Sequence, residues 1–226
     1  MNEIEKTGQA EFDFAAPNPA QKEPSALPPF LRQEGFYFVA LGGAEKVGMN
    51  MYAYLSDGRI IVVDAGYDFL NDDFPGMELG LADPAWLESY RDCIDAMFIT
   101  HSHEDHFGAI AHIWPRLRCP VYATDFTIGH ILPRLREYKL ENEVELISVN
   151  QNPVVKLPDF EVEYVPVVHS LPENSALRIK TKYGTVFHAT DWRFDDCHID
   201  FMKTSYDRLK QVGEQGVDLY VGDSIH

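Results

Sequence analysis

The chain is poor in positive charge. Of its 226 residues, 19 are lysine or arginine and 36 are aspartate or glutamate, which gives a formal net charge of -17. Such a chain repels phosphate backbones at long range, so its composition argues against non-specific nucleic-acid binding. A local positive site remains compatible with this charge, because a bound metal ion can be the largest charge in a pocket.

Cysteine and long apolar runs are also scarce. The three cysteines, Cys93, Cys119 and Cys197, form neither a disulfide framework nor a CxxC metal knuckle. No apolar run has the roughly 20 residues that a membrane-spanning helix needs. The first residues, MNEIEKTGQAEFDF, lack the basic and then apolar order of a secretory signal. We therefore expect reduced thiols, a cytoplasmic protein and no membrane partner.

The first 34 residues differ in composition from the rest. They contain five of the 14 prolines and few periodic apolar positions. This pattern predicts a flexible proline-rich arm at 1–34, followed by one domain at 35–226. The hydrophobic fraction of 45% is enough for that domain to bury a sizeable core.

From Phe36 onward, strand patterns and helix patterns are interspersed. Asp57-Gly58 predicts a hairpin within 49–66, and Asp83 followed by Pro84 predicts a helix start. Further strands are expected at 36–43, 94–100, 119–124, 144–149, 153–157, 160–168, 176–182, 185–190 and 217–223, and further helices at 107–117, 125–138 and 201–212. This order predicts an α/β (α+β) architecture with helices on the outer faces of sheets.

The stretch ITHSHEDHFGAI, residues 99–110, concentrates histidines and carboxylates directly after an apolar strand. His101 and His103 project the same way in an extended chain, and Asp105 and His106 come at the start of the next helix. Imidazole with carboxylate suits zinc, and also manganese or iron. Two adjacent ligand pairs predict two metals that share one water. The alternative is a polar helix start, which would explain the acidic residues but not three crowded histidines.

Two more ligand types follow predicted strands. His169 comes after EVEYVPVV, and Asp191 comes after GTVFHAT. The carboxyl ends of strands are where sites in open sheets collect their side chains. We expect His169 to complete a triad with His101 and His103, and Asp191 to bridge the two metals.

This ordered series, HxHxDH at 101–106 with His169 and Asp191, resembles the motif series of the metallo-β-lactamase fold. The stretches LGGAEKVGMNMY (41–52), VVDAG (62–66), THSHEDHFGAIAHIWPRL (100–117), CPVYAT and HSLPENSAL closely resemble the ribonuclease J family of the β-CASP branch. The similarity runs from about Phe36 to His226. It implies an αββα sandwich, zinc at the site with manganese as an alternative, and RNA as substrate. Members cut RNA endonucleolytically and from the 5′ end, in RNA maturation and turnover.

The resemblance also implies roles for particular residues. It assigns one metal to His101, His103 and His169, and the other to Asp105 and His106, with Asp191 bridging. The catalytic carboxylates, which hold the nucleophile, would be Asp105 and Asp191. Asp64 would orient the cluster by hydrogen bonding, and Asp223 matches the first acidic motif of the β-CASP region.

The chain departs from the family pattern in two respects. Thr190 precedes Asp191, where the family usually has glycine. The β-CASP insertion and the last histidine ligand of the second metal do not follow, so we expect an N-terminal portion with an incomplete sandwich. Such a portion would be a weak nuclease or none alone. The expected partners are a polypeptide that carries the missing region and, as in the intact family, further copies of the same chain.

Two other functions stay open at this point. One is a metallo-β-lactamase-fold hydrolase of thioesters or lactones, against which the detailed match around 41–50 and the Asp223-Ser224 ending argue. The other is a non-catalytic fragment that serves in binding or assembly.

Overall fold

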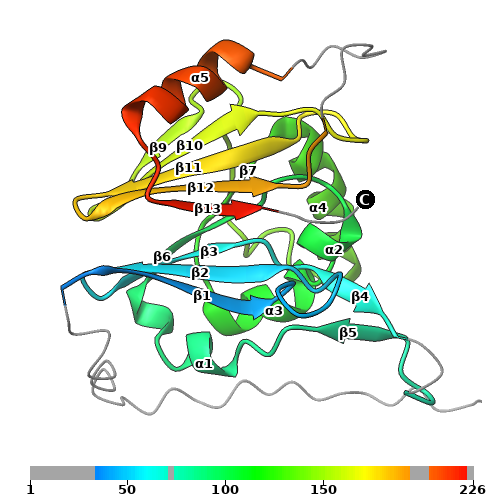
Figure 1. The fold of residues 1–226 in the computed structure, drawn as a ribbon. Coiled ribbons are helices and arrows are strands. Elements are labelled where there is room, and N and C mark those ends of the chain that lie inside the picture. Colours follow the sequence, from blue (N-terminus) through cyan, green and yellow to red (C-terminus); the bar gives the residue numbers. More distant parts are fainter. Residues whose placement is uncertain (1–33, 71–73, 194–203, 223–226) are drawn as a thin grey trace, which may run out of the picture.

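A computed structural model describes residues 34–70, 74–193 and 204–222 of the chain. Residues 1–33 of the expected arm, Cys197 and Asp223 lie outside these ranges. Most strands belong to two sheets that pack face to face (Figure 1). The first sheet has the order β1-β2-β3-β6-β7-β8, with bounds Phe36–Gly42, Met51–Ser56, Arg59–Val63, Ile94–Phe98, Val121–Ala123 and Leu146–Ser148.

The second sheet has the order β13-β12-β11-β10-β9, with bounds Leu219–Gly222, Gly184–Thr190, Ser175–Thr181, Glu161–Pro166 and Val154–Lys156. β12 and β13 run parallel, and the other pairs in this sheet are antiparallel. A separate two-stranded ribbon joins β4, Tyr67–Phe69, to β5, Leu79–Leu81. The sequence pattern did not predict this ribbon.

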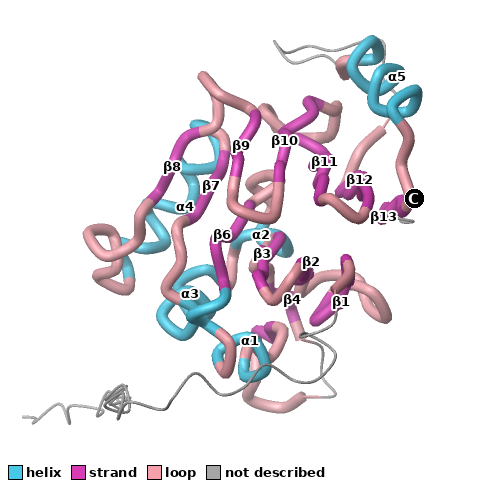
Figure 2. The backbone as a smooth tube through the Cα atoms, turned by 90° about the vertical axis from the view of Figure 1, so that its left-hand side faces the viewer, coloured by secondary structure: helices cyan, strands magenta, loops and turns pink. Residues whose placement is uncertain are grey.

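Helices cover the outer faces of both sheets. α1 (Ala85–Glu88), α3 (Ile110–Leu117) and α4 (Asp125–Glu137) lie against the first sheet, and α5 (Tyr206–Gln215) lies against the second (Figure 2). The short 3-10 helix Arg91–Cys93 and α2, Glu104–Phe107, complete the described elements. This arrangement confirms the predicted αββα sandwich. In the described part of the chain, no helix is long and apolar enough to cross a membrane.

The period-two alternation of the strands sorts the apolar side chains into three layers. In β2, Ala53 faces the helices and Tyr54 faces the opposite sheet. In β11, Leu177 joins the core between the sheets, whereas Ala176 packs toward α5. Burial on both faces explains why β2 and β3 are almost continuously apolar in sequence.

The hairpin predicted at Asp57-Gly58 is confirmed. Ser56 pairs with Arg59, and the two central residues have φ values of 48° and 81°. Positive φ at both positions is the backbone of a type I′ turn, which matches the twist of the flanking strands.

The helix expected at 107–117 is instead split into α2 and α3. The backbone of Ala65 lies between them. Its N–H donates to the carbonyl of His106 at 2.6 Å, and its carbonyl accepts from Ala109 N at 2.9 Å. These two bonds use groups that a continuous helix would pair internally. The interruption places Asp105 and His106 inside their own short helix, beside the loop that follows β3. The helix predicted from Asp83 begins at Ala85, whose N–H donates to Asp83 Oδ1 at 2.9 Å.

Candidate metal centre

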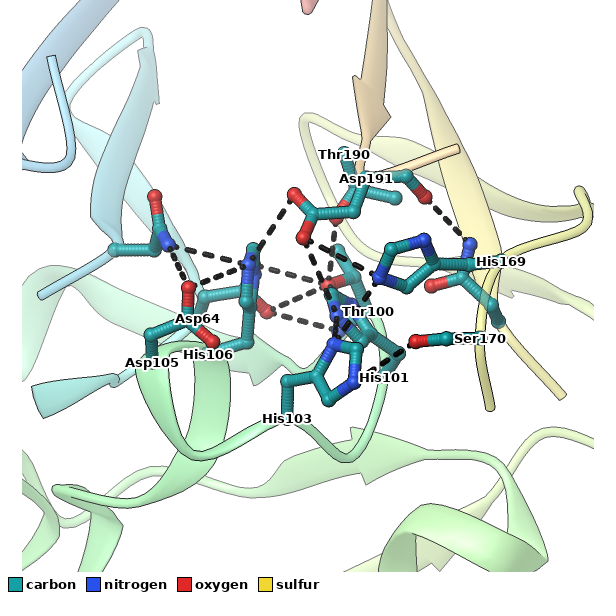
Figure 3. A network of polar contacts seen from close by, with 12 residues as sticks. Asp64, Thr100, His101, His103, Asp105, His106, His169, Ser170, Thr190 and Asp191 are labelled. Atoms are coloured by element: carbon teal, nitrogen blue, oxygen red, sulfur yellow. Dashed lines mark hydrogen bonds and ion pairs between the residues drawn. The ribbon is translucent and has the colours of Figure 1, made fainter. Parts of the chain in front are cut away.

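Six of the predicted site residues meet at one end of the sandwich. His101 follows β6, His169 follows β10 and Asp191 follows β12, whereas His103 precedes α2. Asp105 and His106 lie on α2, and Figure 3 shows all six side chains directed toward a common centre. Asp223, the remaining acid singled out in the sequence, lies outside the described residues.

The first group of donors consists of three histidines and one carboxylate. His103 Nδ1 lies 3.0 Å from His101 Nε2 and 3.2 Å from His169 Nε2. Asp191 Oδ2 lies 3.5 Å from His169 Nε2 and 3.9 Å from His101 Nε2. Ligand atoms that surround a cation at about 2.0–2.2 Å are separated by distances of this order. The group therefore fits a divalent transition metal.

The second group shares Asp191 with the first. His106 Nε2 lies 3.6 Å from Asp105 Oδ2 and 3.4 Å from Asp191 Oδ1. The two oxygens of Asp191 thus face different groups: Oδ2 faces the histidines of the first and Oδ1 faces His106. Within each group, all the donor atoms lie within 4.8 Å of one another. This arrangement is what a carboxylate between two cations requires.

Asp64 is completely buried and lies behind the cluster. Its carboxylate accepts hydrogen bonds from Thr100 N at 2.8 Å, from Thr100 Oγ1 and from His106 Nδ1 at 2.8 Å. Because His106 uses Nδ1 as the donor to Asp64, its Nε2 faces the second group. The carboxylate of Asp64 therefore holds the ring of His106 in this orientation.

Thr100 fixes His101 in the same way. Its hydroxyl has one proton, which goes to Asp64, so it accepts from His101 Nδ1 at 3.0 Å and from Thr190 Oγ1 at 3.1 Å. The Nε2 lone pair of His101 then faces the first group. No pattern in the sequence indicates this role for Thr100, although it directly precedes the histidine motif.

Ser170 and Asn174 were also missed. The Ser170 hydroxyl lies 3.1 Å from His103 Nε2, which leaves Nδ1 of that ring toward the cluster (Figure 3). Asn174 Nδ2 donates to the carbonyl of Asp191 at 2.7 Å. Both belong to the stretch HSLPENSAL, which resembles the family, but no pattern in it singled out these two side chains.

Two other motif residues have unexpected environments. Glu104 accepts hydrogen bonds from Arg134 of α4 at 3.1 and 3.2 Å and so has a structural partner.

Thr190 has a φ of 55°, which is rare for a β-branched residue and favours glycine. The ribonuclease J family, which the sequence resembles, usually has glycine at this position, and glycine adopts this backbone conformation without strain. The side chain of Thr190 makes the same conformation strained. Strain of this kind costs about 1–3 kcal/mol and is typical of functional sites.

Burial and neighbouring charge set the protonation of the ligands. Burial and the nearby histidines hold the pKa of His101 well below its usual value, and burial is the main cause that lowers the pKa of His103 and His169. Burial opposes charge on His106 as well, but Asp64 and Asp191 raise its pKa to about 10. Burial alone would raise the pKa of Asp191, yet His106 and the other histidines hold it below its usual range.

These directions predict that the two groups bind cations with different pH dependence. The three histidines of the first group are neutral near pH 7 and need lose no proton. His106 must lose a proton before its Nε2 can bind a cation, so affinity at the second group should rise about tenfold per pH unit from pH ~7 to ~9. Zinc or manganese titrations against a chromophoric chelator would measure this. Two affinities that are equally flat in pH would contradict it.

A cavity of about 430 Å³ opens beside Asp105, His106 and Asp191. The loop 43–48 forms one wall, and Tyr52 and His188 form another. Its volume is in the range of small-molecule sites. A substrate group could therefore reach the second group of donors from this side.

The fold and the site define the class of protein. Residues 59–207 match the family model described as "Beta-lactamase superfamily domain", and the chain belongs to this superfamily. Among proteins of known function, it is similar to ribonuclease J. It is 39% identical over 199 residues to ribonuclease J of Sinorhizobium meliloti, which covers 86% of this chain and 35% of that protein. It is 36% identical over 202 residues to ribonuclease J of Mycolicibacterium smegmatis, which covers 89% of this chain and 36% of that protein.

The chain thus spans about a third of the length of these relatives. Among solved structures, the metallo-β-lactamase fold protein YhfI of Bacillus subtilis is similar, with a TM-score of 0.52 and 17% identity. That match covers 73% of this chain and 65% of YhfI, and it shows the fold alone. The comparisons confirm the metallo-β-lactamase fold and the resemblance to ribonuclease J that the sequence motifs predicted.

Proposed function

We propose that this chain is the metal-binding portion of a metal-dependent ribonuclease that hydrolyses RNA phosphodiester bonds. The observation that carries the proposal is the shared carboxylate: Asp191 lies 3.5 Å from His169 of the first donor group and 3.4 Å from His106 of the second. Two adjacent cations are a recurrent arrangement in enzymes that hydrolyse phosphodiesters. Similarity to ribonuclease J supports RNA as the substrate class.

In this proposal, His101, His103 and His169 hold the first cation, and Asp105 and His106 hold the second, with Asp191 between them. The donor set suits zinc, and manganese is the alternative. When bound, such cations lower the pKa of a coordinated water and neutralise charge on the phosphoryl oxygens.

The residues of the chain supply the remaining elements of catalysis. Asp105 and Asp191 would accept hydrogen bonds from the attacking water and hold it in line with the phosphorus. The neighbouring histidines favour the ionised form of Asp191, which is the form that binds a cation and accepts a hydrogen bond from water. Asp64, Thr100 and Ser170 fix the rings of His106, His101 and His103, which keeps the ligand atoms in place before substrate arrives.

Substrate would approach through the cavity beside Asp105. Lys46 belongs to the loop that lines it, and the described part of the chain offers little further positive charge there. The proposal therefore includes a partner polypeptide of the β-CASP type to form the rest of the RNA channel. It also includes self-association and a cytoplasmic setting, where RNA turnover takes place.

An assay with labelled 5′-monophosphorylated RNA, thioester and lactone substrates tests the proposal. The chain would be assayed with zinc or manganese, alone and with a β-CASP polypeptide, beside the Asp105→Ala variant and an Asp207→Ala control on exposed α5. We expect metal-dependent cleavage of RNA that Asp105→Ala abolishes and Asp207→Ala retains. Hydrolysis of thioesters or lactones without RNA cleavage would contradict the substrate, and no hydrolysis in either arrangement would contradict an enzymatic role.

A further inference from the structure

In the described part of the chain, Lys46 is the only lysine or arginine that lines the cavity beside the second donor group. Three carboxylates line the same cavity, those of Glu45, Asp105 and Asp191. Asp105 and Asp191 belong to the donor groups. Lys46 is therefore the one group outside the metal centre that offers positive charge to an anion in this cavity.

The loop that carries Lys46 is held close to both α2 and β4. A Cβ on Gly48, which has a φ of 86°, would lie 2.8 Å from Cβ of Asp68, so glycine lets the loop approach β4 this closely (Figure 1). Two residues further on, Asn50 N donates to the carbonyl of Asp105 at 3.0 Å. Residues 44–47 at the tip are exposed. The tip thus stays open to solvent while its base is fixed beside the donor groups.

The partner of Lys46 in this structure is Asp68 of β4. Lys46 Nζ lies 2.9 Å from Asp68 Oδ2, and the two side chains are 52% and 22% exposed. A pair this exposed contributes little to stability, because water screens it and the lysine loses side-chain freedom. Lysine has a flexible four-carbon stem and three donors on a rotatable ammonium group. Lys46 can therefore exchange Asp68 for another anion at small cost.

We propose that Lys46 binds the RNA phosphate next to the scissile one, and that Asp68 occupies Lys46 until the strand enters. The inference rests on the proposed function, which places the scissile phosphodiester at the two cations. The cavity extends from Asp105 to the loop 43–48, so a strand that reacts at Asp105 brings a neighbouring nucleotide toward this loop. Contact between an ammonium and a phosphate is a charge-assisted hydrogen bond. Because it involves the backbone of the RNA, the contact is independent of base sequence.

Lys46→Met removes the charge and keeps most of the stem. We expect the affinity for single-stranded RNA to fall about five- to tenfold at about 50 mM salt. The slope of log affinity against log salt concentration should also become shallower by about 0.7, the contribution of one phosphate contact on a single strand. A purely structural role of Lys46 would leave this slope unchanged.

Asp68→Asn keeps the shape of the side chain and removes its charge. We expect it to tighten RNA binding about threefold, because Lys46 no longer has to leave a carboxylate. Glu45→Gln removes one negative charge from the loop itself and measures the general electrostatic gain, which the gain in Asp68→Asn should exceed. In the Lys46→Met background, the effect of Asp68→Asn should fall to this general gain.

The measurement is fluorescence anisotropy of a labelled single-stranded RNA with phosphorothioate linkages, which are hydrolysed slowly. Protein loaded with zinc is titrated from about 50 to about 200 mM salt, alone and with a β-CASP polypeptide. Thermal unfolding of each variant shows whether it folds.

Lys182→Met is the matched control. Lys182 pairs with Asp57 at 2.5 Å, and these side chains are 62% and 23% exposed, much like Lys46 and Asp68. Asp57 follows the far end of β2, which is about 20 Å long. This distance exceeds the screening length of about 10 Å, so Lys182→Met should bind RNA as the wild type does.

Equal affinity and equal salt slope in the wild type and Lys46→Met would overturn the phosphate contact. Weaker binding in Asp68→Asn than in the wild type would overturn the exchange between Asp68 and phosphate. These results do not depend on turnover: RNA cleavage that Lys46→Met leaves unchanged in affinity removes this inference alone, and RNA binding without cleavage removes the proposed function alone. A wild type that does not bind RNA in either arrangement would remove both.

Discussion

Replacement of Asp64 by alanine is expected to lower the free energy of unfolding of the metal-free protein by about 3–5 kcal/mol. Asp64 is completely buried and accepts hydrogen bonds from the Thr100 backbone, the Thr100 hydroxyl and His106 Nδ1. Its removal takes the acceptor away from these three buried donors and removes a counter-charge of His106. A loss of this size is characteristic of a broken buried pair rather than a surface pair.

Urea denaturation at pH ~7 without metal would measure this loss. Asp68→Ala is the matched control, because Asp68 lies four residues further on and pairs with the half-exposed Lys46 at 2.9 Å. Such a pair contributes about 0–1 kcal/mol. If both variants lost the same small amount, the buried network behind the histidines would not stabilise the fold as described.

Asp191→Ala is expected to reduce RNA cleavage by about a thousandfold, in whichever arrangement cleaves RNA, and to lower the occupancy of both cations. Its oxygens lie 3.5 Å from His169 Nε2 and 3.4 Å from His106 Nε2, so one substitution removes a donor from both groups. It also removes the carboxylate that would hold the attacking water. Values of kcat/KM on labelled RNA and the metal content of the same samples would test this.

Asp191→Asn is the informative companion variant. It keeps the shape of the side chain and one oxygen but loses the negative charge that two cations share. We expect an intermediate loss, with one cation retained. Unchanged metal content and turnover in Asp191→Ala would contradict a bridging role.

Local patterns predicted much of the fold. Asp57-Gly58 specified a turn with positive φ at both positions, and the apolar runs between turn residues located the strands of the two large sheets. The HxHxDH motif also pointed to side chains that the structure brings together, because residues that directly follow a buried strand have little choice of location. His169 and Asp191 were predictable for the same reason.

The parts that were not predicted depend on tertiary approach. The break between α2 and α3 comes from the backbone of Ala65, which is some 40 residues away in sequence and gives no local signal. Asn50 likewise reaches Asp105 only because the segment between β1 and β2 meets α2 in space. Thr190 adopts positive φ although its sequence preference opposes it, so only the resemblance to a glycine position hinted at this backbone.

The metal content of dialysed protein tests the central claim most directly. His103 contributes the ring nitrogen closest to both His101 and His169, at 3.0 and 3.2 Å, so its removal should disable the first donor group. We predict that the wild type retains at least about one equivalent of transition metal per chain and that His103→Ala retains clearly less. A wild type with less than about one equivalent, unchanged by His103→Ala, would contradict the account of this cluster as a metal centre.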